Sequence, residues 1–162
     1  MTFMYQGIVH IKTKKKEHII HNLGAQALFN LFAEFLVGNV TKMTDTKSIQ
    51  IFRGTSQDLI SSSTAHQEVM VSHKIPLKSQ QTERTDNGTY AATFYTTIKQ
   101  EFLVEKTAQY NDYSIGLFSG STLLAVITFD KNVYNDILNG GRADVKWKMM
   151  LSNQSTVQQG GS

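Results

Sequence analysis

The feature that most constrains the fold is one amphipathic segment, Asn22 to Asn39, which is followed by a long series of strand-like alternations. Its apolar side chains recur at spacings of three and four, which places them on one face of a helix: Leu23, Ala27, Leu28, Leu31, Phe32, Phe35 and Leu36. Asn22 is suited to cap the first turn, and Gly38 can adopt the left-handed conformation that ends a helix. We expect one amphipathic helix over 22–38 that packs on a sheet; the alternative is a helix that docks on a neighbouring subunit.

The rest of the chain shows the period of two that is typical of half-buried strands. Strands are expected at 3–12, 18–21, 48–53, 68–77, 89–98, 113–118, 123–129 and 143–151. The first two should form a hairpin, and Ser119-Gly120-Ser121 should join another. Pro76 ends its strand or places it at a sheet edge.

Polar segments separate these strands. Connections are expected at 13–17, 40–47, 54–67, 79–87 and 132–142, whereas 102–110 is ambiguous. About seven or eight antiparallel strands with one helix predict a mostly β fold, an antiparallel β-sandwich. Residues 1–151 should form this single domain, and 152–162 a polar C-terminal tail.

The last expected strand has the clearest alternation. Its apolar side chains are Val145, Trp147, Met149 and Leu151, and the intervening charged ones are Asp144, Lys146 and Lys148. This pattern indicates a half-buried antiparallel strand with one face toward solvent. Trp147 is therefore expected in the core; the alternative is a platform for a ligand.

Composition narrows the function classes. The chain has 162 residues, which fits one domain, and it has no cysteine, which excludes disulfides and thiolate metal sites. Its net charge of +3 is mild, whereas a dedicated nucleic-acid binder usually has a denser basic face. The N-terminus lacks the pattern of a cleaved signal peptide, and the longest apolar segment is interrupted by polar residues. We expect neither membrane insertion nor direct nucleic-acid binding.

No pattern of catalytic or metal-ligating residues stands out. His18 and His21 should point to opposite faces of a strand, so they are poorly placed to share a metal. Phosphate loops, the H-E-x-x-H motif and the nucleophile elbow are missing from the sequence. Glu101 and Glu105, and likewise Asp130 and Asp136, fit solvated faces and turns better than an acid–base pair. We expect no catalytic residue, no cofactor and no metal, and therefore a protein that is not an enzyme.

The order of several short motifs carries a family resemblance. The helix start contains an asparagine and a glycine, Asn22 and Gly24, and a Gly-Thr turn follows at Gly54 and Thr55. A hairpin comes next, with Gly116 to Phe118, Leu124, Ala125, Thr128 and Phe129. A strand with a central tryptophan, Trp147, closes the order. This order, over most of 5–151, resembles small virion structural proteins of tailed bacteriophages, of the tail-fibre, collar and baseplate accessory type. The Asn-, Gln-, Lys- and Thr-rich composition is also similar to that of phages of AT-rich gut bacteria, such as the crAss-like group.

The resemblance implies a non-enzymatic ring or adaptor subunit of the tail, collar or connector, present in many copies in the virion and assembled in the host cytoplasm. Its partners would be copies of itself and other virion proteins, among them tail, portal or capsid components. Contacts are expected through sheet edges and loops, with these candidate interface residues: Lys14, Lys15, Lys16, Arg53, Gln57, Asp58, Tyr110 and Tyr113.

Alternatives to this function remain open on the sequence. The lysines near the first turn fit a solvated turn that discourages edge pairing, or a contact with nucleic acid or an acidic partner. Tyr110, Tyr113 and Tyr134 could stack on sugars, which would suit a module that binds a host receptor or glycan. A capsid decoration protein is a further variant of the structural role.

Overall fold

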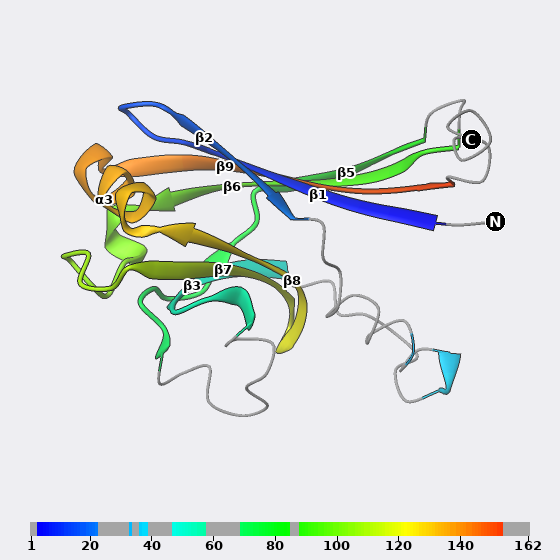
Figure 1. Ribbon diagram of the computed structural model, residues 1–162, viewed down its shortest axis with the longest axis horizontal. Helices are drawn as coiled ribbons and strands as arrows, with labels where there is room; N and C mark the ends of the chain where they lie inside the picture. Colours follow the sequence, from blue (N-terminus) through cyan, green and yellow to red (C-terminus); the bar gives the residue numbers. More distant parts are fainter. Residues whose placement is uncertain are drawn as a thin grey trace.

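The protein is a sandwich of two antiparallel sheets with a helix at one side (Figure 1). The computed structural model describes residues 3–22, 33, 36–38, 47–57, 69–84 and 88–153, and these contain nine strands. The larger sheet has the order β2 (Glu17–Asn22), β1 (Phe3–Lys12), β9 (Arg142–Asn153), β6 (Tyr90–Lys99), β5 (Ser79–Arg84). The smaller sheet has the order β4 (Ile75–Pro76), β3 (Lys47–Arg53), β7 (Asp112–Ser119), β8 (Thr122–Asp130). The predicted mostly β sandwich is confirmed.

The last strand of the chain, β9, occupies the centre of the larger sheet. It pairs with β1 on one side and with β6 on the other, so Trp147 lies opposite both Val9 and Phe94. These three side chains point inward, and Trp147 is only 1% exposed. The alternation in this strand therefore places the tryptophan in the core, as predicted.

The core fills the space between the sheets with β-branched and aromatic side chains. The larger sheet contributes Val9, Ile11, Ile98, Val145 and Trp147, and the smaller sheet contributes Ile49, Ile51, Ile115, Leu117 and Ile127. Each of these side chains is at most 3% exposed. Burial of a side chain of this size stabilises the fold by roughly 1.5–3 kcal/mol before entropy is subtracted.

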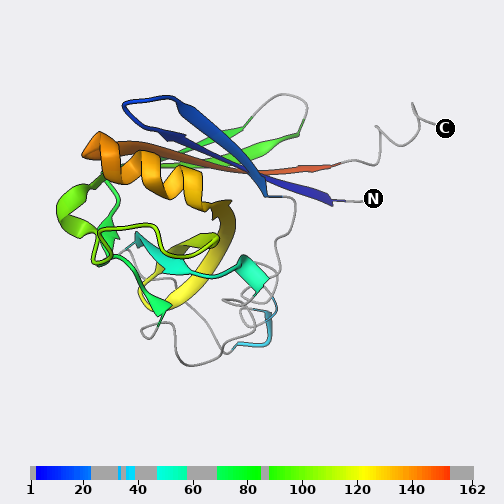
Figure 2. The same cartoon turned by 60° about the vertical axis from the view of Figure 1, so that its left-hand side comes forward.

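Residues 131–140 form a helix, α3 (Lys131–Gly140), where the sequence predicted a connection, so that prediction was wrong. The carboxylate of Asp130 accepts hydrogen bonds from the backbone N–H groups of Asn132 and Val133, at 2.9 and 3.2 Å. Gly141 ends the helix with φ +77°. One face is buried: Val133, Tyr134, Asp136, Ile137 and Leu138. Figure 2 shows α3 along one side of the sandwich, between the sheets.

The helix expected over 22–38 lies outside the described residues except at Ala33 and Leu36–Gly38. Ala33 and Leu36 have helical conformations. Leu36 is 81% exposed, so it does not belong to a buried face as expected. Asn22 is the last residue of β2 and pairs with β1, while the residues that it was expected to cap lie outside the described part of the chain, so its capping role stays a prediction.

Two further expectations fail near the edges of the sheets. The segment 79–87 was expected to be a connection, but its first six residues form β5, all of them exposed. The strand expected over 68–77 is reduced to β4 and isolated bridges at Met70 and Ser72. The Ser72 hydroxyl explains part of this, because it accepts a hydrogen bond from the backbone N–H of Ile51 at 2.8 Å. A side chain thus occupies a donor that a continuous strand would have used.

Candidate functional site

Within the described ranges, no three or more His, Asp or Glu side chains are grouped so as to hold a metal ion. In the same part of the chain, no helix is long and apolar enough to cross a membrane.

A cluster of tyrosines closes one end of the sandwich. The rings of Tyr113 and Tyr134 are stacked, with centroids 4.2 Å apart, and both residues are 0% exposed. The Tyr113 hydroxyl donates to Glu105 Oε1 at 2.9 Å, and the Tyr134 hydroxyl donates to the backbone oxygen of Glu105 at 2.7 Å. The tyrosines therefore hold the segment that precedes β7 against the core. Both rings are buried, so the prediction that Tyr113 and Tyr134 stack on sugars was wrong, and so was the prediction that Tyr113 contacts a partner.

The electrostatics of this cluster fit a structural role. Burial raises the pKa of Tyr113, and the hydrogen bond and negative charge of Glu105 raise it further. Burial also raises the pKa of Tyr134 well above its usual value, again with a smaller contribution from Glu105. The raised pKa keeps both phenols protonated even above the pH at which a free tyrosine ionises, so they remain hydrogen-bond donors there.

Two of the predicted interface residues meet in one surface contact. Arg53 Nη1 donates to the Tyr110 hydroxyl at 2.8 Å, and the guanidinium carbon lies 5.3 Å from the centre of the Tyr110 ring. Arg53 is exposed and Tyr110 is half-buried, so this pair is accessible from solvent. Gln57 is also exposed, whereas Asp58 lies outside the described residues.

The three predicted lysines lie together on the turn between β1 and β2. Lys14, Lys15 and Lys16 are exposed, which fits a solvated turn. The turn is closed by Thr13, whose hydroxyl donates to the backbone oxygen of Lys16 at 2.9 Å and accepts from its N–H at 3.1 Å. It passes close to the end of α3, since a Cβ added to Gly140 would lie 3.2 Å from the backbone nitrogen of Lys14.

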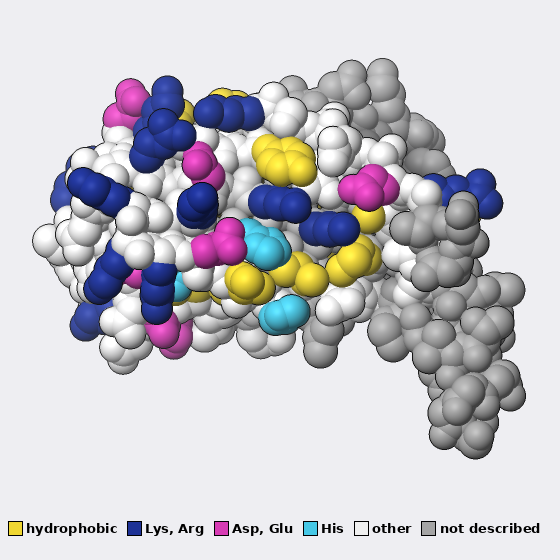
Figure 3. Space-filling model, turned by 90° about the horizontal axis from the view of Figure 1, so that it is seen from above, with side chains coloured by type: hydrophobic (Ala, Val, Ile, Leu, Met, Phe, Trp, Pro, Cys, Tyr) yellow, Lys and Arg dark blue, Asp and Glu magenta, His cyan; other side chains and the backbone are white. Residues whose placement is uncertain are grey.

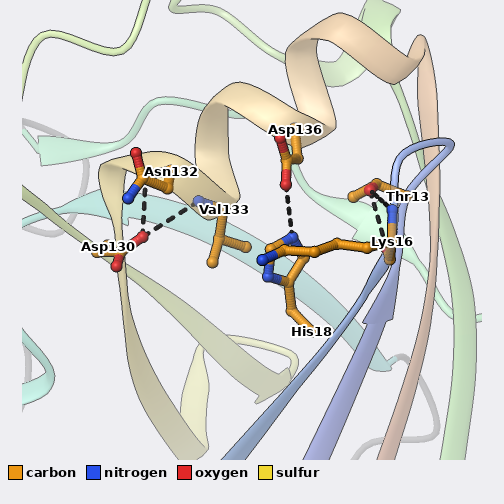
Figure 4. A network of polar contacts seen from close by, with 7 residues as sticks. All are labelled: Thr13, Lys16, His18, Asp130, Asn132, Val133 and Asp136. Carbon is orange, nitrogen blue, oxygen red and sulfur yellow. Dashed lines mark hydrogen bonds and ion pairs between the residues drawn. The ribbon is translucent and has the colours of Figure 1, made fainter.

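A polar pair joins β2 to α3 beneath this turn (Figure 4). His18 Nε2 lies 2.8 Å from Asp136 Oδ2, and the two side chains are 10% and 11% exposed. Sequence reasoning missed this pair because it placed Asp136 in a connection. The signal that could have found it is the helical spacing of Val133, Tyr134 and Ile137 around Asp136.

The larger sheet has an open edge at β5. All six of its residues, Ser79 to Arg84, are exposed, and the strand pairs only with β6 among the described strands. The backbone N–H and C=O groups on the outer side of such a strand are available to pair with another chain. The edge strand β4 of the smaller sheet, in contrast, has only two residues.

The outer face of the larger sheet gathers lysines from distant parts of the sequence (Figure 3). We call this surface the lysine face and define it by six side chains: His10, Lys12, Lys78, Tyr95, Lys146 and Lys148. The strand register places Lys146 between His10 and Tyr95, while Lys148 lies one step further along β9 on the same side. Five of the six, all but Lys148, line a groove of about 550 Å³. A second hollow of about 310 Å³ also includes Lys12, together with Lys14 and Arg142.

Two carboxylates also line the groove. Asp144 Oδ1 accepts from the Thr97 hydroxyl at 2.9 Å and from Arg142 Nη2 at 3.3 Å. The hydrogen bond from Thr97 is the largest cause of the lowered pKa of Asp144. Burial opposes it, and the contact with Arg142 and the positive charge of Lys78 lower the pKa further. Glu17 Oε1 lies 3.8 Å from His10 Nδ1. The carboxylates thus have local partners, whereas the described contacts show no ion pair for Lys12, Lys78, Lys146 or Lys148.

Sequence reasoning found only part of the lysine face. The alternation of Lys146 and Lys148 was visible, but the pairing of β9 with β1 and β6 was not, because those strands are far away in the sequence. Comparisons of the chain with family models, with curated proteins and with solved structures found no match.

Proposed function

We propose that this chain is a non-enzymatic structural subunit that assembles in several copies through a sheet edge, as a ring or adaptor in the tail, collar or connector of a tailed phage. The phage setting is supported by the order of sequence motifs. The mode of assembly is supported by one observation, the fully exposed edge strand β5. Edge strands recruit further strands through backbone hydrogen bonds, and side chains then select the register.

The side chains of β5 suit pairing between two copies of itself. In an antiparallel pair with Thr82 opposite the same residue of the second copy, Gln81 faces Glu83 and Gln80 faces Arg84. Each of these pairs can form a hydrogen bond, and no like charges are opposed. A two-fold axis at Thr82 would join the larger sheets of two copies into one continuous sheet and so form a dimer. A ring would be built from such dimers through a second, heterologous contact.

The shape of the molecule leaves room for this contact. Figure 1 shows strands of the larger sheet continuing beyond the smaller sheet toward the chain termini. β5 lies at the edge of this sheet opposite to β2, and therefore away from the pair of His18 and Asp136 that joins β2 to α3. Pairing at β5 leaves that pair undisturbed.

Sedimentation velocity over a wide concentration range tests the mode of assembly. The variant Gln80→Lys/Thr82→Lys places two like charges on the edge and should shift the protein toward monomers. Asn111→Lys/Ser121→Lys adds the same charge at exposed sites elsewhere and should assemble like the wild type. Amide hydrogen exchange should show that protection of 79–84 rises with protein concentration.

Two results would contradict the proposal. If the wild type stays monomeric at all concentrations, copies of the chain do not assemble through β5. Absence of the chain from purified particles, examined by mass spectrometry, would remove the virion role. A capsid decoration role would instead place the chain on the capsid shell in a map of the intact particle.

A further inference from the structure

We propose that the lysine face binds single-stranded nucleic acid, with lysines along the backbone and Tyr95 against a base. This inference goes beyond the structural role and does not depend on it, because the face lies on the broad surface of the larger sheet and not on its edge. The net charge of +3 gives no reason to expect such a site. The site is visible only once the strand order is known.

The charge on this face is concentrated, and its lysines outnumber the carboxylates beside them. Lys12, Lys78, Lys146 and Lys148 carry four positive charges, and none of them forms an ion pair among the described contacts. Asp144 is engaged by Thr97 and Arg142, and Glu17 lies beside His10. The charge of Lys78 still acts on Asp144, but the groove keeps an excess of positive charge, which is the arrangement that tracks a phosphate backbone.

The spacing of the lysines fits a polymer with regularly repeated charges. Lys146 and Lys148 are alternate residues of β9, so their Cα atoms lie about 7 Å apart along the strand. This distance is similar to the separation of successive phosphates in an extended single strand. In the opposite direction the same side of β9 carries Asp144, and Lys12 lies across from it on β1 and provides the next positive charge. A row of this kind suits a linear polyanion better than a single compact anion.

An aromatic ring beside the row favours nucleic acid over an acidic peptide. Tyr95 is the direct cross-strand neighbour of Lys146, is half-buried and lines the groove. On the other flank, Ile19 is 53% exposed and pairs with His10. Bases can stack on the tyrosine ring and contact the isoleucine, whereas aspartate and glutamate side chains gain nothing from either.

Fluorescence anisotropy with labelled dT20 and rU20 tests the proposal on the full chain. Lys146→Gln/Lys148→Gln should weaken binding about tenfold or more, and the slope of log affinity against log salt should fall by roughly 1.4, about 0.7 for each phosphate contact. Lys74→Gln/Lys131→Gln removes two exposed lysines outside this face and should leave the affinity within about twofold of the wild type, apart from weaker long-range effects. Tyr95→Ala should weaken binding about tenfold, and Tyr95→Phe should retain it.

Three outcomes would overturn the inference. The first is no binding of either oligonucleotide at 50 mM salt. The second is an equal loss of affinity in the two lysine variants, which would indicate unspecific attraction by net charge. The third is competition by polyglutamate at equal charge concentration together with no effect of Tyr95→Ala, which would assign the face to an acidic polypeptide. The fluorescence of the single tryptophan, Trp147, reports whether each variant is folded.

Discussion

Replacing Tyr113 by phenylalanine removes one hydroxyl group and leaves the stacked ring in place. That hydroxyl donates to Glu105 Oε1 at 2.9 Å. It also accepts hydrogen bonds from the backbone N–H groups of Gln109 and Tyr110, at 3.0 and 3.2 Å. A single oxygen atom thus ties three points of the 105–110 segment to the core.

The expected loss of stability follows from these contacts. A hydrogen bond to a charged group contributes about 1.5–3 kcal/mol, and a neutral one about 0.5–1.5 kcal/mol. Glu105 and Tyr110 are only half-buried and Gln109 is exposed, so water replaces part of what is lost. We expect Tyr113→Phe to lower the free energy of unfolding by about 2 kcal/mol. For a chain of this length, that corresponds to a fall in Tm of roughly 4–8 °C.

Tyr5→Phe is a matched control with the opposite expected sign. The Tyr5 hydroxyl is also buried, but within the described part of the chain it has no hydrogen-bond partner. Its removal takes away an unsatisfied polar group, so the free energy of unfolding should stay constant or rise by up to about 1 kcal/mol. The same chemical change should therefore differ by about 2–3 kcal/mol between the two positions.

Urea titrations followed by Trp147 fluorescence give both values, and amide hydrogen exchange locates the effect. In Tyr113→Phe the N–H of Tyr110 should exchange faster. The N–H of Gln109 should respond less, because it also donates to Glu105 Oε1 at 3.2 Å, and those of β9 should change only with global stability. Equal destabilisation by Tyr5→Phe and Tyr113→Phe would refute the reasoning, because it would show that the hydrogen bonds of the Tyr113 hydroxyl do not determine how much unfolding free energy is lost.

The remaining predictions concern a cap, a titration and a close contact. Asp130→Ala should destabilise the protein by about 1 kcal/mol in urea titrations, because α3 loses its cap. Asp112→Asn removes a like charge opposite Asp130 and should not destabilise the protein. Equal losses of stability in the two variants would contradict the capping role. Burial raises the pKa of Tyr5 to about 12, so above pH 10 only the unfolded chain ionises there, and stability should fall by up to about 1.4 kcal/mol per pH unit until the folded pKa is reached. The urea midpoint at pH 8, 10 and 11 measures this fall, and Tyr5→Phe should reduce it; an identical fall in that variant would assign it to other groups. Gly116→Ala should cost about 1–3 kcal/mol in thermal unfolding, because the added Cβ would lie 2.8 Å from the Phe118 ring, and an unchanged Tm would show that the ring can move aside.

Sequence patterns were sufficient wherever one face of a strand is buried. The alternation in 48–53 and 143–151 predicted β3 and β9 with the correct inward side chains, since Ile49, Ile51 and Trp147 are all buried. The hairpin of β7 and β8 was also predicted, and Gly120 in its turn has φ +61°. In these elements, local polarity and tertiary environment agree.

The missed elements lack that agreement. β5 is exposed on both faces, so no polarity difference marks it, and its pairing with β6 alone makes it a strand. α3 contains three asparagines and ends in glycine, residues with low helix propensity. Its buried positions, Val133, Tyr134 and Ile137, follow a helical period that spans too few turns to outweigh those residues.

Strand order, and not composition, creates the lysine face, because it depends on β9 being inserted between β1 and β6. The same strand presents Trp147 to the core and Lys146 and Lys148 to solvent, so a single alternation sets both the packing and the charge of the surface. A slip of the register by one residue would bury both lysines and expose the tryptophan, at a cost of many kcal/mol. Packing around Trp147 therefore fixes the positions of the two lysines along the groove. A substitution of Lys146 or Lys148 therefore changes the charge of the lysine face but not the register of β9. Tyr95 keeps its position beside residue 146.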